Sequence, residues 1–275
     1  MKSFEGRVVA LTGAGSGIGR ALALDLARRG ALLALSDVDP EGLAETVDLV
    51  KAAGVREVRS DVVDVASRTA LDSWAESVVG QFGRVDVLVN NAGVSLTGEV
   101  GDLDVEDMQW IVDINFWGVV HGTRAFLPHL IASGDGHVVT MSSLFGLVSI
   151  PGQSLYNATK YAVRGFSESL REELLIARHP VGVTVVHPGG IKTAIARRGR
   201  VSSREDKDSF VAMFDGKLAK VTPERAADVI LRGVLRGKPR VLVGLDAHVL
   251  HQLGRVVGAR YQDLVAQQAR RMRRR

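Results

Sequence analysis

The sequence predicts a doubly wound α/β fold, in which helices cover both faces of a mostly parallel, seven-stranded sheet. Three observations favour this fold class. Short apolar runs alternate with longer amphipathic segments along the chain, which is typical of β-α-β units. A glycine-rich turn follows the first apolar run. Polar residues follow several later runs, where open α/β sheets bind their ligands.

Each element is placed by its apolar period and by the turn residues that bound it. The expected strands cover residues 7–11, 32–35, 55–60, 85–89, 138–141, 183–186 and 241–243. The expected helices cover residues 21–30, 41–53, 66–82, 105–133, 153–178, 222–235 and 246–272. Residues 192–222 show no regular period and are charged, so we expect an irregular lid there.

The composition indicates a single folded domain. The chain has 275 residues, 46% of them hydrophobic, and no linker or composition break divides it. We expect one domain over 1–275, with a core at about 6–244 and a helical extension at 245–275. There is no cysteine, so disulfides and thiolate sites are excluded, and no metal site is predicted. No membrane span or signal peptide is expected, which favours a cytoplasmic protein.

The net charge of +4 is unevenly distributed along the chain. Five arginines stand among the last six residues, so the remainder carries 4 − 5 = −1. A solvated helix end is one interpretation of this tail, and attraction to nucleic acid or to an anionic membrane is the other. No aromatic residues are interleaved with the arginines, so we expect no specific nucleic-acid partner.

The first turn has the features of a dinucleotide site. It reads T-G-A-G-S-G-I-G over residues 12–19, between a strand and a helix. Glycines allow a tight turn and close approach of the backbone to a pyrophosphate, which then lies at the helix N-terminus. Strand, turn and helix together predict a Rossmann fold. The cofactor-binding candidates in this turn are Gly13, Ser16, Gly17, Ile18 and Gly19.

Asp37 ends the second strand, about 20 positions after the glycines. A carboxylate there can bind the adenosine ribose and would repel a 2′-phosphate, so it favours NAD over NADP. Asp37 could instead cap the next helix, but Asp39 is better placed to do so. Arg20 favours the opposite preference, because a cation beside the turn could tolerate the phosphate of NADP.

Tyr156 and Lys160 are four residues apart in a segment with helical period, so they share one helix face. A neighbouring ammonium lowers the pKa of a phenol, whose ordinary value is about 10, and suits it to proton transfer. Ser143 follows an apolar run thirteen residues upstream of Tyr156. A tyrosine and a lysine at this spacing are also common on ordinary helix surfaces, so the pair alone is weak.

Two further sites carry amides. Asn115 stands mid-helix among apolar residues, where an amide needs partners, which favours a functional role. Asn90 and Asn91 precede Ala92 and Gly93 at the end of a strand. Small residues there suit a backbone packed beside a flat ring, although a generic turn is the alternative.

Taken together, these motifs resemble the short-chain dehydrogenase/reductase family from about Gly6 to Val243. The matching motifs are T-G-A-G-S-G-I-G at 12–19, D-V at 61–62, N-N-A-G at 90–93, Asn115, Ser143, Y-N-A-T-K at 156–160 and P-G-G-I-K-T at 188–193. The last thirty or so residues depart from the family core. The resemblance adds these cofactor-binding residues: Asp61, Val62, Asn91, Ala92, Gly93, Tyr156, Lys160, Pro188, Gly189, Ile191 and Thr193.

The resemblance implies an NAD(P)-dependent oxidoreductase that interconverts a secondary alcohol and a ketone. Tyr156 would be the acid/base, Ser143 would bind the substrate oxygen, and Lys160 would lower the tyrosine pKa and bind the nicotinamide ribose. Asn115 would hold a water that links Lys160 to solvent. The alternatives are an NADPH-dependent carbonyl reductase with the same site and a nucleotide-binding protein without turnover.

Segments 95–99, 144–150 and 210–214 are expected to border the pocket. Five apolar residues of one expected wall favour a lipophilic substrate: Leu144, Phe145, Leu147, Val148 and Ile150.

The resemblance implies a homodimer through helices 105–133 and 153–178. The first of these helices has more apolar residues than one face needs to cover a sheet: Phe116, Trp117, Val119, Val120, Phe126 and Leu127. A homotetramer would need a second interface near the C-terminus.

Overall fold

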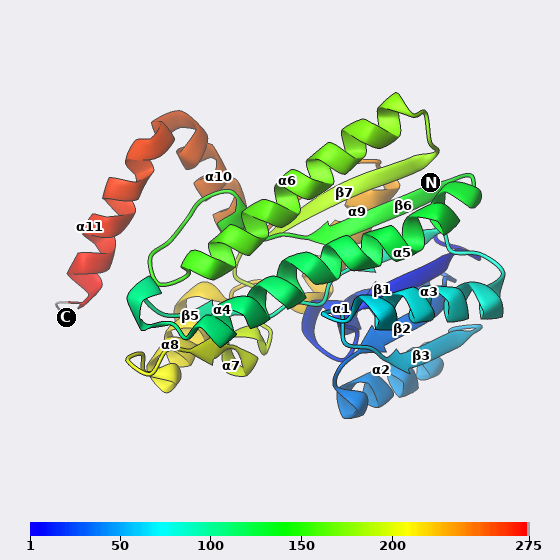
Figure 1. The fold of residues 1–275 in the computed structure, drawn as a ribbon, viewed down its shortest axis with the longest axis horizontal. Coiled ribbons are helices and arrows are strands. Elements are labelled where there is room, and N and C mark those ends of the chain that lie inside the picture. Colours follow the sequence, from blue (N-terminus) through cyan, green and yellow to red (C-terminus); the bar gives the residue numbers. More distant parts are fainter. Residues whose placement is uncertain (274–275) are drawn as a thin grey trace.

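Seven parallel strands form the centre of the protein in the computed structural model, which describes residues 1–273 apart from the side chains of Lys217 and 271–273. Their order is β3-β2-β1-β4-β6-β7-β9 (Figure 1). The strands are β1 (Val8–Thr12), β2 (Leu32–Asp37), β3 (Val58–Val62), β4 (Val87–Asn90), β6 (Gly136–Met141), β7 (Val181–Pro188) and β9 (Arg240–Val243). The predicted fold class is confirmed, whereas the core boundaries at 6–244 stay a prediction.

Helices cover both faces of this sheet because its strands are apolar on both sides. Val9 and Leu11 of β1 pack against one group of helices, and Val8 and Ala10 pack against the other. The first group is α1 (Gly17–Arg28), α2 (Pro40–Ala52) and α9 (Pro223–Leu235). The second group is α3 (Arg68–Phe82), α5 (Gly118–Ala132) and α6 (Ser154–Ile176), in front of the sheet in Figure 1.

The helix expected over 105–133 is interrupted at Asn115. It consists of α4 (Val105–Val112), a π-helical turn η2 (Asp113–Trp117) and α5. Single π-turns inside α-helices insert one extra residue and are frequent at functional sites. Asn115 lies in this turn. An apolar period of 3.6 residues does not reveal such an insertion, which explains the difference.

Two of the six residues expected at a helix–helix interface are instead in the core. Val119 and Phe126 are buried, and the Phe126 ring packs edge-on against Trp74 of α3 with centroids 5.0 Å apart. Trp117 is 43% exposed and stacks on His121. The helix therefore presents fewer apolar residues outward than its sequence predicted.

The expectation of irregular structure over 192–222 was wrong, whereas its role as a lid stays a prediction. The segment folds into α7 (Ile195–Arg198), β8 (Arg200–Val201), α8 (Lys207–Met213) and a π-turn η4 (Phe214–Leu218). β8 pairs in parallel with β5 (Leu96–Thr97), beside α4 (Figure 1). Arginines join the segment to distant carboxylates, Arg198 to Asp39 at 3.1 Å and Arg200 to Asp107 at 2.6 Å. These tertiary ion pairs leave no periodic signal in the sequence.

The helix expected over 246–272 is also broken. α10 (Leu245–Val257) and α11 (Tyr261–Arg273) are separated by a 3₁₀ turn, η5 (Gly258–Arg260), because Gly258 adopts φ +60°. Figure 1 shows α11 beyond the N-terminal end of α6, away from the sheet. The Tyr261 hydroxyl accepts a hydrogen bond from the backbone N–H of Ser149 at 2.9 Å. Arg274 and Arg275 of the predicted arginine-rich tail lie outside the described residues.

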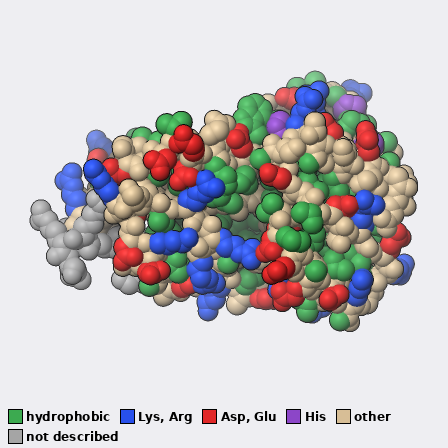
Figure 2. Space-filling model, turned by 60° about the horizontal axis from the view of Figure 1, so that its bottom comes forward, with side chains coloured by type: hydrophobic (Ala, Val, Ile, Leu, Met, Phe, Trp, Pro, Cys, Tyr) green, Lys and Arg blue, Asp and Glu red, His purple; other side chains and the backbone are tan. Residues whose placement is uncertain are grey.

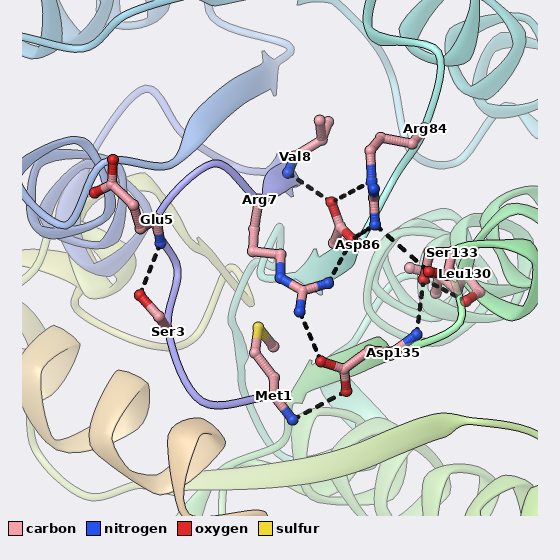
Figure 3. Close-up of polar contacts among 10 residues, drawn as sticks. All are labelled: Met1, Ser3, Glu5, Arg7, Val8, Arg84, Asp86, Leu130, Ser133 and Asp135. Atoms are coloured by element: carbon pink, nitrogen blue, oxygen red, sulfur yellow. Dashed lines mark hydrogen bonds and ion pairs between the residues drawn. The ribbon is translucent and has the colours of Figure 1, made fainter.

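A buried carboxylate joins the amino ends of the strands, opposite the predicted site. Asp86 is fully buried and accepts hydrogen bonds from the backbone N–H of Val8 and the guanidinium groups of Arg7 and Arg84 (Figure 3). Arg7 also pairs with Asp135 at 2.7 Å. Hydrogen bonds from two guanidinium groups and one backbone N–H offset much of the cost of burying the Asp86 carboxylate.

No helix in the part of the chain that the structure describes combines the length and the hydrophobicity needed to cross a bilayer.

Two histidines are buried within the sheet without a carboxylate partner. His137 of β6 contacts the Thr184 hydroxyl through Nε2 at 2.8 Å, and His187 of β7 contacts the Ser143 carbonyl through Nδ1 at 2.9 Å. Burial lowers the pKa of each imidazole to about 4. Both rings are therefore neutral in the folded protein at neutral pH.

These two histidines predict acid destabilisation. The unfolded chain takes up a proton on each imidazole near pH 6.5, whereas the folded chain does so only near pH 4, so stability falls as pH drops between these values. Each histidine should lower the free energy of unfolding by roughly 2 kcal/mol between pH 7 and pH 5. In urea unfolding, His137→Gln should lower stability at pH 7 but lose about 2 kcal/mol less than wild type on acidification. An unchanged loss would contradict this account.

Candidate active site

The parallel register brings the predicted residues to one edge of the sheet. Asp37 pairs with Val62 in the β2–β3 register, and Thr12 pairs with Ser36 in the β1–β2 register. Asn90 pairs with Thr140, next to the end of β6. All these residues lie at the carboxyl ends of their strands, which is where ligands bind in open α/β sheets.

The glycine turn is packed so closely that side chains are excluded. A Cβ on Gly19 would lie 1.9 Å from the Gly13 carbonyl oxygen, and one on Gly13, which has φ +68°, would lie 2.8 Å from the Ala92 Cα. The Asn91 amide donates to the carbonyls of Thr12 and Gly13, at 3.0 Å each. These two hydrogen bonds link the segment after β4 to the end of β1 and its glycine turn.

Helix α1 begins at Gly17, with Ser16 as its N-cap and Ile18 in its first turn. The Ser16 side chain makes no capping hydrogen bond. The first backbone N–H groups of a helix have no partner within the helix and carry the positive end of its dipole. Thr193 packs on this turn, since a Cβ on Gly17 would lie 3.0 Å from its Cγ2. The turn therefore has the features of an anion site.

Asp37 and Arg20, which point to different cofactors, have different surroundings. The Asp37 carboxylate accepts from the backbone N–H of Gly15 at 2.7 Å and of Asp39 at 3.0 Å, and it has capacity for further donors. Arg20 is held by the carboxylate of Glu45 at 2.7 Å and by the Gly15 carbonyl. Asp39 caps α2, as expected, by accepting from Gly42.

Asp61 and Val62 lie beside Asp37 at the end of β3. The Asp61 carboxylate is already engaged by the Arg59 guanidinium at 2.6 Å and by the Trp74 indole N–H at 3.2 Å. The sequence did not predict these two partners, which come from the same strand and from α3. Val62 is largely exposed at this edge.

Ser143, Tyr156 and Lys160 come together in the interior. All three are buried, and the Ser143 side chain lies near enough to the Tyr156 hydroxyl to favour its phenolate. Ser143 also accepts from the Phe145 backbone N–H at 3.1 Å. The spacing of thirteen residues therefore brings the two side chains together in the same buried site.

The tyrosine pKa does not shift as the sequence predicted. Burial raises the pKa of Tyr156, because it penalises the phenolate, and the Ser143 hydrogen bond only partly opposes this effect. The Lys160 ammonium lies 5.5 Å from the centre of the Tyr156 ring, over its face. It donates instead to the Met141 carbonyl at 3.0 Å. The protein alone thus keeps Tyr156 protonated.

Lys160 is a buried lysine with a lowered pKa. Burial lowers the pKa of its ammonium to about 8, because a charged group loses hydration in the interior. Gly93 leaves the space beside it, since a Cβ there would lie 3.3 Å from the lysine Nζ. The end of β6 is tied to the same helix by Ser142, whose hydroxyl donates to the Lys160 carbonyl at 2.8 Å.

Asn115 has the partners that a buried amide needs. Its Oδ1 accepts from the Val94 backbone N–H at 2.8 Å, and its Nδ2 donates to the Val94 carbonyl at 2.9 Å and to Thr159 at 3.3 Å. The amide therefore holds the segment after Gly93 against α6. This position agrees with a functional interpretation, although the sequence did not reveal that the side chain binds backbone.

The segment after β7 closes this edge of the sheet and includes the candidates Pro188, Gly189 and Ile191. Asp246, which sequence reasoning missed, accepts from the Gly190 backbone N–H at 2.7 Å. A Cβ on Gly189 would lie 2.2 Å from the same carboxylate. Asp246 follows a strand and starts a helix, and that position was the only available signal.

The expected apolar wall divides into two parts. The Phe145 ring packs edge-on against Tyr156 with centroids 6.0 Å apart. Leu144 and Val148 are buried under α10 instead, so they do not line an open pocket. Leu96, which lies in the segment 95–99 expected to border the pocket, belongs to the cluster around Tyr156, and so does Ile195, which the sequence reasoning did not select.

Among residues 1–273, the structure shows no group of three or more His, Cys, Asp or Glu side chains that could hold a metal ion.

Comparisons with known proteins agree with this geometry. SadH of Mycobacterium tuberculosis, whose name classes it as an oxidoreductase, is 57% identical to this chain. The alignment covers 97% of this chain and 96% of the SadH chain. A short-chain dehydrogenase/reductase from Burkholderia phymatum in complex with NAD has a TM-score of 0.84 and 31% identity, covering 97% of each chain. An alcohol dehydrogenase from Thermococcus sibiricus complexed with 5-hydroxy-NADP has a TM-score of 0.72 and 27% identity, over 87% of this chain and 95% of its own.

The match to SadH leaves only 3% of this chain uncovered, so most of the C-terminal extension is shared with that relative. The sequence model of the short chain dehydrogenases matches residues 7–203. The chain therefore belongs to the short-chain dehydrogenase/reductase family and is an oxidoreductase of that family.

Proposed function

We propose that the protein is an NAD-dependent dehydrogenase that interconverts a secondary alcohol and a ketone. The observation that carries this proposal is the burial of Ser143, Tyr156 and Lys160 in one site, with the Ser143 side chain near the tyrosine hydroxyl and the Lys160 ammonium over the tyrosine ring. A proton acceptor, a hydrogen-bond donor and a cation in one dry site are what alcohol oxidation requires.

In the oxidation direction, Tyr156 accepts the proton of the substrate hydroxyl. Ser143 donates a hydrogen bond to the substrate oxygen and stabilises the charge that develops there. Because burial raises the pKa of Tyr156 in the protein alone, the phenolate must be favoured by nearby positive charge. Lys160 supplies one such charge, and a bound oxidised nicotinamide carries another.

The residues at the sheet edge fit a nicotinamide dinucleotide. The close contacts at Gly13 and Gly19 leave a cradle with no side chains for a pyrophosphate, and Ser16 and the start of α1 supply donors. Lys160 and Asn91 to Gly93 are suited to the nicotinamide ribose and ring. When bound, the cofactor accepts or supplies the hydride, while the protein orients it and controls the proton.

Asp37 favours NAD over NADP in this proposal. Its carboxylate can accept further hydrogen bonds, such as those from ribose hydroxyls. Among the contacts of the described residues it has no cationic partner, since Arg20 pairs with Glu45 instead. A 2′-phosphate would meet this negative charge. The alternative remains an NADPH-dependent carbonyl reductase with the same site, and the Thermococcus sibiricus neighbour was solved with an NADP derivative.

An apolar substrate is favoured by the residues around Tyr156. Phe145, Leu96 and Ile195 surround it, and ion pairs hold the segment that carries Ile195 over this side of the protein. Such a site suits a lipophilic alcohol or ketone better than a sugar phosphate.

Replacing the proton acceptor should abolish turnover. Tyr156→Phe should lower kcat with NAD and a secondary alcohol by about 10³-fold or more, since it removes the acid/base group. NADH binding, followed by fluorescence, should change little. Tyr161→Phe, which changes an exposed tyrosine on the same helix, is the matched control and should remain active. Comparable activity in Tyr156→Phe would contradict the assignment.

Removing the carboxylate at the end of β2 should weaken cofactor discrimination. The kcat/KM of the wild type should be higher with NAD than with NADP. Asp37→Ala should reduce the ratio of these two kcat/KM values about tenfold, because a repulsive charge is lost. Asp48→Ala removes the same charge from the exposed side of α2 and should leave the ratio unchanged. A wild-type preference for NADP would reverse the interpretation of Asp37 and Arg20.

We also propose that the protein is a dimer through α5 and α6. Trp117, Leu175 and Ile176 are exposed apolar residues on these helices or the turn that joins them to α4, and a two-fold contact would cover them. Light scattering at micromolar concentration should give about twice the 29.5 kDa mass of one chain, or four times that mass if a second interface forms. Trp117→Glu should reduce the mass, and a monomeric wild type would refute the interface.

A further inference from the structure

Helix α10 is apolar on two opposite faces. Its inner face, with Ala247 and Leu250, packs on Leu144 and Val148. The opposite face, which we call the outer stripe, is largely exposed in the described chain. Its four apolar side chains stand at helical spacing of four, four and three residues, and their exposed fractions are 85% for Leu245, 64% for Val249, 37% for Leu253 and 84% for Val256. A helix with two apolar faces needs a second surface to cover it.

The charge of the C-terminal extension is strongly positive. Residues 245–275 contain seven arginines and two aspartates, so they carry 7 − 2 = +5, and the rest of the chain carries 4 − 5 = −1. One of the aspartates, Asp246, is engaged by the Gly190 backbone N–H. Figure 2 shows Lys and Arg side chains beside the grey residues at the C-terminal end of the molecule.

Exposed apolar side chains together with arginines select one kind of partner. A second copy of this chain would bring a second extension of +5 against the first, and like charges oppose such a contact. Nucleic acid would attract the arginines but gives no use to an aliphatic stripe. A bilayer with anionic headgroups uses both features, because aliphatic side chains enter the interface while cations meet the lipid charge.

We propose that the outer stripe of α10, aided by the net positive charge of residues 245–275, binds anionic lipid bilayers peripherally. In this contact, helix α10 lies in the plane of the membrane. The proposal does not depend on the catalytic roles proposed above. Arg255 and His248 flank the stripe on the same helix, where polar side chains of an interfacial helix meet the headgroups.

The test is sedimentation of the full-length protein with lipid vesicles. Vesicles of phosphatidylcholine with phosphatidylglycerol should bind at least about tenfold more tightly than phosphatidylcholine alone, and high salt should abolish the difference. Val249→Ser with Val256→Ser should weaken binding at least about tenfold. Val105→Ser, which changes a valine that is 72% exposed on α4, is the matched control and should bind as wild type. Circular dichroism should report an unchanged fold in each variant.

Truncation after Ala269 separates the two contributions. It removes five of the seven arginines and keeps the stripe, so it should weaken binding to anionic vesicles and leave the weaker binding to neutral ones. The proposal is overturned if wild type does not bind anionic vesicles, or if the serine variant binds as well as wild type. It is also overturned if the serine substitutions halve the mass in light scattering, because a second copy would then cover the stripe.

Discussion

The buried ammonium of Lys160 is the constraint around which the site is arranged. A cation that loses its hydration is costly unless protein groups replace the water, and here the Met141 carbonyl is its hydrogen-bond acceptor. That cost lowers the lysine pKa to about 8. Gly93 leaves the space beside the ammonium, and Asn115 fixes the next residue through both backbone groups of Val94. The π-turn at Asn115 belongs to the same arrangement.

Parallel strand pairing makes this arrangement possible. The strands end at one edge, so a glycine turn, Asp37, the end of β6 and the segment after β7 meet there although they are far apart in the chain. The opposite edge holds the strands together through Asp86 and its arginines. Stability and chemistry are thus separated between the two ends of the sheet, and changes at the ligand edge need not disturb the ion-pair cluster.

The segments that surround the site depend on long-range polar contacts. Arg198 and Arg200 join residues 192–222 to the turn after β2 and to α4, and Asp246 joins the start of α10 to the segment after β7. Surface ion pairs of this kind contribute little each. Several together with the short β5–β8 pairing hold a segment that has few buried apolar residues of its own. The C-terminal extension differs, because its inner face is anchored by apolar packing on Leu144 and Val148.

The sequence by itself determined the seven strands, the glycine turn and the spacing of Ser143, Tyr156 and Lys160, because these depend on local period and fixed offsets along the chain. It could not determine the π-turn at Asn115, the helices within 192–222 or the break at Gly258, since each depends on tertiary contacts or one backbone angle. It also predicted a lowered pKa for Tyr156 from the proximity of Lys160. Only the tertiary structure decided that burial raises it, because desolvation depends on everything that surrounds the hydroxyl.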